Sequence, residues 1–415
     1  MSIRQVRHRP GGDVSPFSGY VVVAAAFVIT SAVWAVYYAF GIFFKPMLNE
    51  FEWTRAMTSG PFSVSLITSG ILAVAMGGLT DRLGPRAVMS LCGLLLGAGY
   101  ILLSQVSALW QLYLFYGVIV GAGMGGGFIP LMSTVTRWFF EKRSLMSGIV
   151  ASGIGVGALI GPKTAGWLIP VYGWRVSYAM MGAVLLVVVV LFAQPLKRDP
   201  ARKDPAIRDD GEGKKTLAGA LTEGLSLKAA LVTGRFWIFF ATGFCYGFCV
   251  FSVMVHIAPY AGELGLSAPV AANILATVGA MSIIGKVALG RAGDTIGSRQ
   301  TMLLGFALVS AAQFWLATGE GAGTLYAAGG LFGFSYGGCT VAHSPLVALL
   351  FGLRYHGLIF GVFSLSVMIG GAVGPFMTGH LCDVYGNYHA AFLVSAGISV
   401  AGVLLTSVLK QERVK

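Results

Sequence analysis

The chain has 415 residues, of which 56% are hydrophobic and only 11% are charged. A soluble domain carries about 25% charged residues, so no soluble class fits these proportions. The 59 glycines and the long apolar runs indicate a polytopic α-helical membrane protein, because a β-barrel would show short alternating segments instead.

Apolar runs of spanning length fall at 20–44, 57–79, 87–104, 109–135, 145–169 and 174–194 in the first half of the chain. In the second half they fall at 235–260, 270–292, 300–318, 323–350, 357–381 and 389–409. The first run is too long for the apolar core of a signal peptide, so it counts as the first span. The sequence therefore predicts an all-α membrane protein of twelve transmembrane helices in two six-helix bundles. The predicted divisions are a tail (1–19), a bundle (20–194), a linker rich in Pro, Lys and Asp (195–233), a second bundle (234–409) and a tail (410–415).

Lysine and arginine placement predicts the orientation. With both termini on the cytoplasmic side, that side holds 23 of the 28 Lys and Arg residues. The opposite loops hold only Lys45, Arg55 and Arg175, while Lys163 and Lys286 lie inside apolar runs. This asymmetry predicts that both termini are cytoplasmic. It also explains the net charge of +12 as an insertion signal, so we expect no nucleic-acid partner.

The two halves repeat at one offset of 213 residues. It relates Gly77 to Gly290, Asp81 to Asp294, and Arg86 to Arg299. It also relates the pairs Gly148 and Gly361, Gly157 and Gly370, Gly161-Pro162 and Gly374-Pro375, and Val171-Tyr172-Gly173 and Val384-Tyr385-Gly386. So many matches at one offset indicate a duplicated six-helix unit.

Several segments resemble the major facilitator superfamily. The carrying residues are GGLTDRLGPR (77–86), its copy GRAGDTIGSR (290–299), and Gly153-x3-Gly157-x3-Gly161-Pro162. Within that superfamily the chain is similar to the monocarboxylate transporter and oxalate–formate antiporter group, through FGIFFKPMLNEFEWTRA (40–56), RWFFEKRSLMSGI (137–149), HIAPYAGELGLSAPVAA (256–272) and YGWR (172–175). The resemblance implies a carrier with a cation in helix 8 that engages the substrate carboxylate, and Lys286 falls there. Two family features differ, since Ser282 replaces an acidic partner and Ser18-Gly19-Tyr20 replaces an acidic-glycine signature.

Lys286 is the main candidate for substrate binding. A charged side chain at the bilayer centre costs about 2.5–3.5 kcal/mol on insertion scales, so such residues usually have a function. Small residues (Gly279, Ser282, Gly290) lie at helical spacing around it. The bland alternative is a lysine that reaches the inner headgroups. We favour the anchor, because the offset places Ala73 opposite Lys286 and the first half has no equivalent charge.

Aromatic and histidine side chains supply the other candidates. Tyr37, Tyr38, Tyr116 and Tyr336 lie on helices 1, 4 and 10, which line the cavity in the family that the chain resembles. His256 and His343 can take a proton near neutral pH, although a structural histidine bonded to a carbonyl group is an open alternative for each. No Asp or Glu lies inside the twelve runs. If protons move, a histidine, Lys286 or the substrate itself must therefore carry them.

The paired turns supply candidate gating residues. Asp81, Arg86, Asp294 and Arg299 lie at inner helix ends, where their charges can pair across the halves in an outward-facing state; a role in topology alone is the alternative. Gly121-Ala-Gly123-Met-Gly-Gly126 fits a dinucleotide fingerprint, but it lacks the required strand and acidic residue. We expect these glycines to permit close packing or a bend in helix 4.

The predicted function is secondary active transport of a small monocarboxylate such as lactate or pyruvate. We expect symport with protons, by an alternating-access mechanism. We expect no enzymatic activity, cofactor or metal site, and a monomer surrounded by membrane lipid. An anion exchanger of the oxalate–formate type shares the motifs. It is disfavoured because helix 11 (357–381) has no second cation for a dianion. A non-transporting membrane receptor is the alternative from another class.

Overall fold

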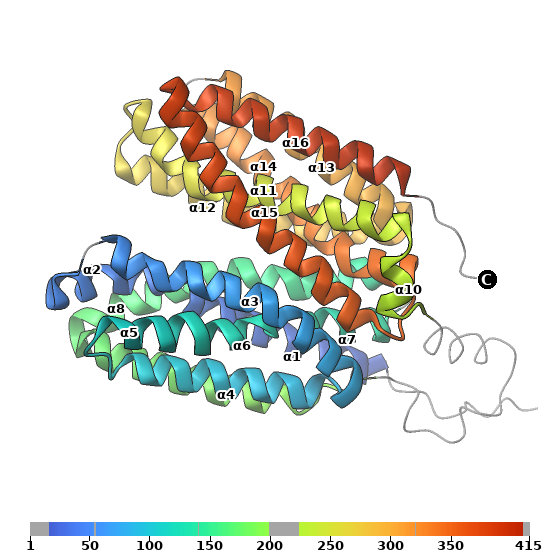
Figure 1. The fold of residues 1–415 in the computed structure, drawn as a ribbon, viewed down its shortest axis with the longest axis horizontal. Coiled ribbons are helices and arrows are strands. Elements are labelled where there is room, and N and C mark those ends of the chain that lie inside the picture. Colours follow the sequence, from blue (N-terminus) through green and yellow to red (C-terminus); the bar gives the residue numbers. More distant parts are fainter. Residues whose placement is uncertain (1–15, 54, 140, 199–223, 320, 410–415) are drawn as a thin grey trace, which may run out of the picture.

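The computed structural model describes residues 16–53, 55–139, 141–198, 224–319 and 321–409. The two predicted tails, apart from residues 16–19, and most of the predicted linker lie outside these described residues. The described chain folds into helices that form two bundles, one from each half of the sequence (Figure 1).

The helices of the first bundle are α1 (Pro16–Tyr38), α2 (Phe40–Phe51), α3 (Arg55–Leu83), α4 (Pro85–Leu103), α5 (Leu109–Leu112), the π-helix η1 (Tyr113–Val120), α6 (Gly121–Gly125), α7 (Ile129–Trp138) and α8 (Arg143–Ala193). Those of the second are α10 (Leu227–Leu231), α11 (Gly234–Glu263), α12 (Ala268–Ile296), α13 (Ser298–Thr318), α14 (Ala322–Phe351), α15 (His356–Tyr385) and α16 (Tyr388–Val408).

Helix α8 accounts for two of the predicted spans. The described residues contain 11 helices long and apolar enough to cross a membrane, and α8 alone has 51 residues. A bilayer core needs only about 20 residues. The helix is interrupted at Gly173 (φ 77°, ψ 161°), a backbone geometry that glycine adopts readily. With α8 counted as two spans, the predicted twelve-helix fold is confirmed.

A polar cluster holds the turn at Gly173 against the end of α2. Trp174 Nε1 donates to Glu50 Oε2 at 2.6 Å, and Arg175 donates to Glu50 Oε1 at 2.5 Å. The Arg175 guanidinium also lies 4.4 Å from the centroid of the Trp174 ring. The hydrogen bond from Arg175 lowers the pKa of the Glu50 carboxyl below its ordinary value.

The fourth predicted span, 109–135, is not a regular α-helix. After the short α5, eight residues form a π-helix, and the chain leaves helical geometry again between Gly125 and Ile129. A Cβ atom added at Gly123 would lie 2.6 Å from Leu96 Cγ, so this glycine also permits close helix packing. Both the bend and the close packing expected of this glycine-rich segment are therefore present.

The first predicted span, 20–44, agrees with the membrane span Gly19–Phe44 of the structure. This span consists of α1 and the start of α2, and α2 itself continues to Phe51. The last part of the predicted linker is also ordered, because Leu225 N donates to the Phe351 carbonyl at 2.9 Å and α10 follows.

The bundles approach each other at one end and diverge at the other (Figure 1). We call the first the linker end, marked by Gly84, Lys142, Gly297 and Gly352. The opposite end, marked by Glu52, Gly173, Gly321 and Gly386, is the far end. The helix pairs α3/α15 and α8/α12 make the main contacts between the two halves.

Candidate functional site

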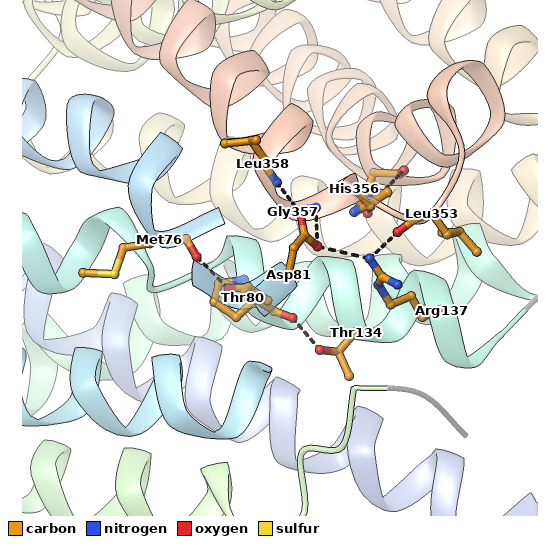
Figure 2. A network of polar contacts seen from close by, with 11 residues as sticks. Met76, Thr80, Asp81, Thr134, Arg137, Leu353, His356, Gly357 and Leu358 are labelled. Atoms are coloured by element: carbon orange, nitrogen blue, oxygen red, sulfur yellow. Dashed lines mark hydrogen bonds and ion pairs between the residues drawn. The ribbon is translucent and has the colours of Figure 1, made fainter. Parts of the chain in front are cut away.

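Asp81 joins the two bundles at the linker end. It lies near the end of α3, is 8% exposed, and accepts hydrogen bonds from the backbone N–H groups of Gly357 (3.1 Å) and Leu358 (2.8 Å) at the start of α15 (Figure 2). Arg137 Nη2 forms an ion pair with the same carboxylate at 3.1 Å and also donates to the Leu353 carbonyl. A carboxylate is stabilised there because the first N–H groups of a helix have no intrahelical partner.

Asp294 makes the equivalent contact in the opposite direction. Near the end of α12, it accepts from Ser144 N at 2.8 Å and from Leu145 N at 3.1 Å in the first turn of α8. The offset of 213 residues that relates Asp81 to Asp294 also relates Ser144 to Gly357 and Leu145 to Leu358. Each half therefore supplies a carboxylate to a helix N-terminus of the other half.

Glycines bring the same helices into close contact. A Cβ atom at Gly148 would lie 2.2 Å from the Lys286 carbonyl oxygen, and one at Gly361 would lie 2.5 Å from the Ala73 carbonyl oxygen. The offset also relates Gly148 to Gly361 and Ala73 to Lys286. Both contacts need glycine, since any side chain would force the helices apart.

The predicted arginines of this region lie elsewhere. Arg86 is exposed at the start of α4. Arg299 donates to the Thr406 carbonyl at 3.2 Å, inside its own bundle. The guanidinium that meets Asp81 belongs to Arg137 of the RWFFEKR motif, which was not among the predicted gating residues.

A cavity of about 160 Å³ lies between the bundles. Its lining residues are Trp34, Tyr38, Phe128, Ile154, Tyr246, Val250, Phe251, Met254, Lys286, Tyr336, Thr340, His343, Phe360, Phe363, Ser364, Val367 and Met368. We call it the central cavity. Pockets for drug-sized ligands measure about 300–1,000 Å³, so this volume suits a smaller molecule.

Lys286 is the one Lys, Arg, Asp or Glu among those lining residues. It is 1% exposed, so its side chain stays in the interior and does not extend to headgroups. Its Nζ lies 3.5 Å from Ser282 Oγ and 5.5 Å from the centroid of the Tyr336 ring. A hydroxyl group and an aromatic face stabilise an ammonium group only in part, and no described carboxylate forms an ion pair with it.

Two further polar atoms lie at this cavity. Trp34 Nε1 and His343 Nε2 are buried, and neither has a hydrogen-bond partner among the described residues. Buried polar atoms normally have partners, so this pair has the properties of groups that meet a ligand or water. Trp34 belongs to the first bundle, whereas His343 and Lys286 belong to the second.

The structure separates the predicted tyrosines into two groups. Tyr38 and Tyr336 line the central cavity. Tyr37 and Tyr116 instead stack on each other, with ring centroids 6.2 Å apart, inside the first bundle, where Tyr37 OH pairs with Ser65 Oγ at 3.4 Å. Neither is among the residues that line the cavity.

His256 lies away from the central cavity, towards the far end. Its Nδ1 is 3.2 Å from Tyr388 OH, and its Nε2 is 3.0 Å from the Pro375 carbonyl. Such contacts match the structural alternative named for this residue. Trp34, Tyr246, Thr340 and Ser364 were missed at the sequence level, because apolar or hydroxyl side chains in a transmembrane run carry no distinctive signal.

Two membrane-spanning bundles with a cavity between them, joined by a contact network at one end, have the architecture of a membrane transporter. The chain belongs to the Major Facilitator Superfamily, which it matches over residues 25–291 and 257–415.

Curated relatives are similar over nearly the whole chain. Monocarboxylate transporter 13 of Rattus norvegicus is 28% identical over 94% of this chain and 88% of its own length. Monocarboxylate transporter 11 of Homo sapiens is 28% identical over 95% and 83%. The uncharacterized MFS-type transporter YhjX of Escherichia coli (strain K12) is 27% identical over 74% and 75%. The fold is similar to that of the transporter FucP in its outward conformation, with TM-score 0.74 at 17% identity over 95% of this chain and 100% of that chain.

Proposed function

We propose that the protein is a secondary active transporter of small monocarboxylate anions, coupled to protons. The observation that carries this proposal is Lys286, a buried cation at a small cavity with no described carboxylate paired to it. An anionic cargo of matching size would complete its electrostatic environment. Relatives named monocarboxylate transporters support a carboxylate as the cargo.

The cargo would contact both bundles. Lys286, Tyr336 and His343 meet it from the second bundle, and Trp34 and Tyr38 meet it from the first. Because these groups lie on both halves, binding can change the relative free energies of the states in which the halves rock about the cavity.

The linker end is assigned to the cytoplasm by the excess of Lys and Arg on that side. With that orientation, the Asp81 and Asp294 contacts close the cytoplasmic side, and the described state is outward-facing. The proton would travel on the cargo, on His343 or on Lys286, since the lining residues include no carboxylate. The bacterial inner membrane is the compartment that we assign to it.

Uptake into proteoliposomes tests the proposal. Lys286→Gln should abolish uptake of [14C]lactate driven by an inward proton gradient, and Lys286→Arg should retain part of it. Lys163→Gln is a matched control, because Lys163 is an exposed lysine on another spanning helix. Uptake by Lys286→Gln at the wild-type rate would refute the proposal. Uptake that ignores the gradient and requires a counter-anion inside the liposomes would replace symport with exchange of the oxalate–formate type.

A further inference from the structure

A second and larger cavity adjoins the central cavity. It has a volume of about 620 Å³ and lies between α3 on one side and α11 and α15 on the other. Of its 15 lining residues only Ser63 has a polar side chain. We call it the lateral pocket. Its volume falls within the range of about 300–1,000 Å³ that takes sizeable organic ligands.

Phe251 and Met368 line both cavities. The Phe251 ring lies against Gly371, where a Cβ atom would come within 2.6 Å of its Cδ2. Met368 is a flexible side chain that adapts to different neighbours. The two cavities therefore share part of their walls, which one aromatic ring and one unbranched side chain supply.

The lateral pocket lies farther from the linker end than the central cavity. On α15 the lining of the central cavity ends at Met368, whereas that of the lateral pocket ends at Pro375, seven residues or roughly 10 Å further along the helix. The floor of the lateral pocket is the contact of α3 with α15, where a Cβ atom at Gly70 would lie 3.2 Å from Met368 Cβ. A ligand anchored at Lys286 that extends past Phe251 or Met368 would enter this pocket.

We propose that the lateral pocket is a binding site for the apolar tail of the cargo, so that the carrier accepts amphipathic monocarboxylates with medium-length acyl or bulky hydrocarbon chains. The inference rests on the proposed function, because it takes Lys286 as the carboxylate anchor. The distribution of polarity supports it: the cation lies in the central cavity, and the space beyond Phe251 and Met368 is apolar. The expected gain is about fourfold in affinity for each methylene removed from water.

Calorimetric titration of the purified full-length protein in phosphatidylcholine nanodiscs tests this site, with empty nanodiscs titrated as the blank. The probes are propionate, hexanoate and octanoate, together with octanamide, which has the tail of octanoate without its charge. We expect the Kd to fall from propionate to octanoate and octanamide to bind weakly. Ala372→Phe should raise the Kd of octanoate at least about tenfold by filling the pocket, and leave that of propionate within about twofold.

Matched variants make the result specific. Ala75→Phe is the control, because Ala75 is also exposed on a helix that borders the pocket but is not among its lining residues. Ile67→Trp fills the pocket from the opposite wall and should act like Ala372→Phe. Equal affinities for propionate and octanoate, or equal effects of Ala372→Phe and Ala75→Phe, would overturn the proposal.

Two other outcomes distinguish the sources of failure. If octanamide binds as tightly as octanoate and Lys286→Gln spares both, the pocket holds an acyl chain of the bilayer and the cargo-tail proposal is wrong. If Lys286→Gln binds propionate as well as the wild type does, the carboxylate anchor fails, and the proposed function fails with it. If the Kd does not change with chain length but propionate binding still requires Lys286, only the lateral-pocket proposal is wrong and the proposed function stands.

Discussion

Removing the charge of Asp81 should destabilise the state in which the linker end is closed. Asp81→Asn leaves one acceptor oxygen, so it removes one of the two backbone hydrogen bonds and the charge of the ion pair with Arg137, whose side chain is 3% exposed. Hydrogen bonds to charged groups contribute about 1.5–3 kcal/mol each, and an amide oxygen retains part of that. Arg137 also keeps its bond to the Leu353 carbonyl. We therefore expect a loss of about 2–3 kcal/mol, or roughly 30- to 150-fold in the ratio of linker-end-closed to linker-end-open states.

The second half supplies the internal comparison. Asp294 has the same two backbone contacts, but no described ion pair with a guanidinium. Asp294→Asn should therefore cost less, about 1 kcal/mol or roughly fivefold. Asp81→Glu retains the charge and controls for the loss of negative charge at this position.

Distances between spin labels at the far end report this equilibrium. Val171→Cys and Val384→Cys place labels on exposed residues, 59% and 61% exposed, that are related by the internal offset. Cys382, the one cysteine that is not fully buried, is replaced by Ser in this background. Asp81→Asn should shift the distribution strongly towards the shorter distance, and Asp294→Asn should shift it less. Equal shifts from the two variants, or an unchanged distribution in Asp81→Asn, would refute the reasoning.

Two other perturbations follow from the described contacts. Gly148→Ala should prevent closure of the linker end, because its Cβ would lie 2.2 Å from the Lys286 carbonyl oxygen; Gly166→Ala, on the same helix with no atom within 4 Å, should leave the label distances and uptake unchanged. Uptake by Gly148→Ala at the wild-type rate would contradict this expectation, because it would show that the helices can separate at this position without loss of transport. The Glu50 carboxylate, whose pKa is lowered by Arg175, stabilises the fold above its ordinary pKa of 4.5, and this contribution disappears as the pH falls through the lower folded value. Thermal unfolding of Glu50→Gln should therefore depend less on pH below about 4.5 than that of the wild type, and parallel curves would contradict this role.

Hydropathy and glycine patterns predicted most of the architecture. The bilayer thickness sets the length of each apolar run, and glycines mark the positions where membrane helices pack closely. The twelve spans and the break near Gly173 follow from such patterns. The extension of α2 to Phe51 does not, because residues 45–51 are amphipathic and their helix depends on contacts such as the one between Glu50 and Trp174.

The candidate site was predictable only where a residue type is rare in its setting. Lys286 met that condition, since a lysine in an apolar run has few structural reasons to be there. Tyr37 and Tyr38 are adjacent in sequence and point in directions about 100° apart around the helix. Because both are tyrosines, the residue type does not indicate which of them faces the cavity. Trp34 was missed for a similar reason, because a tryptophan in a spanning helix is ordinary, and only the structure shows that its Nε1 has no hydrogen-bond partner among the described residues.

The reciprocal contacts of Asp81 and Asp294 also bear on how the two copies of the unit could diverge after duplication. Each aspartate binds main-chain N–H groups, and any residue other than proline offers the same donor. One of the two receiving positions does differ between the copies, since Ser144 corresponds to Gly357, while the other is leucine in both, at Leu145 and Leu358. The two aspartates had no such freedom, because no substitution on the receiving helix compensates for a lost carboxylate. Drift in one copy could therefore produce a single cation such as Lys286 while the pairing of the halves stayed intact.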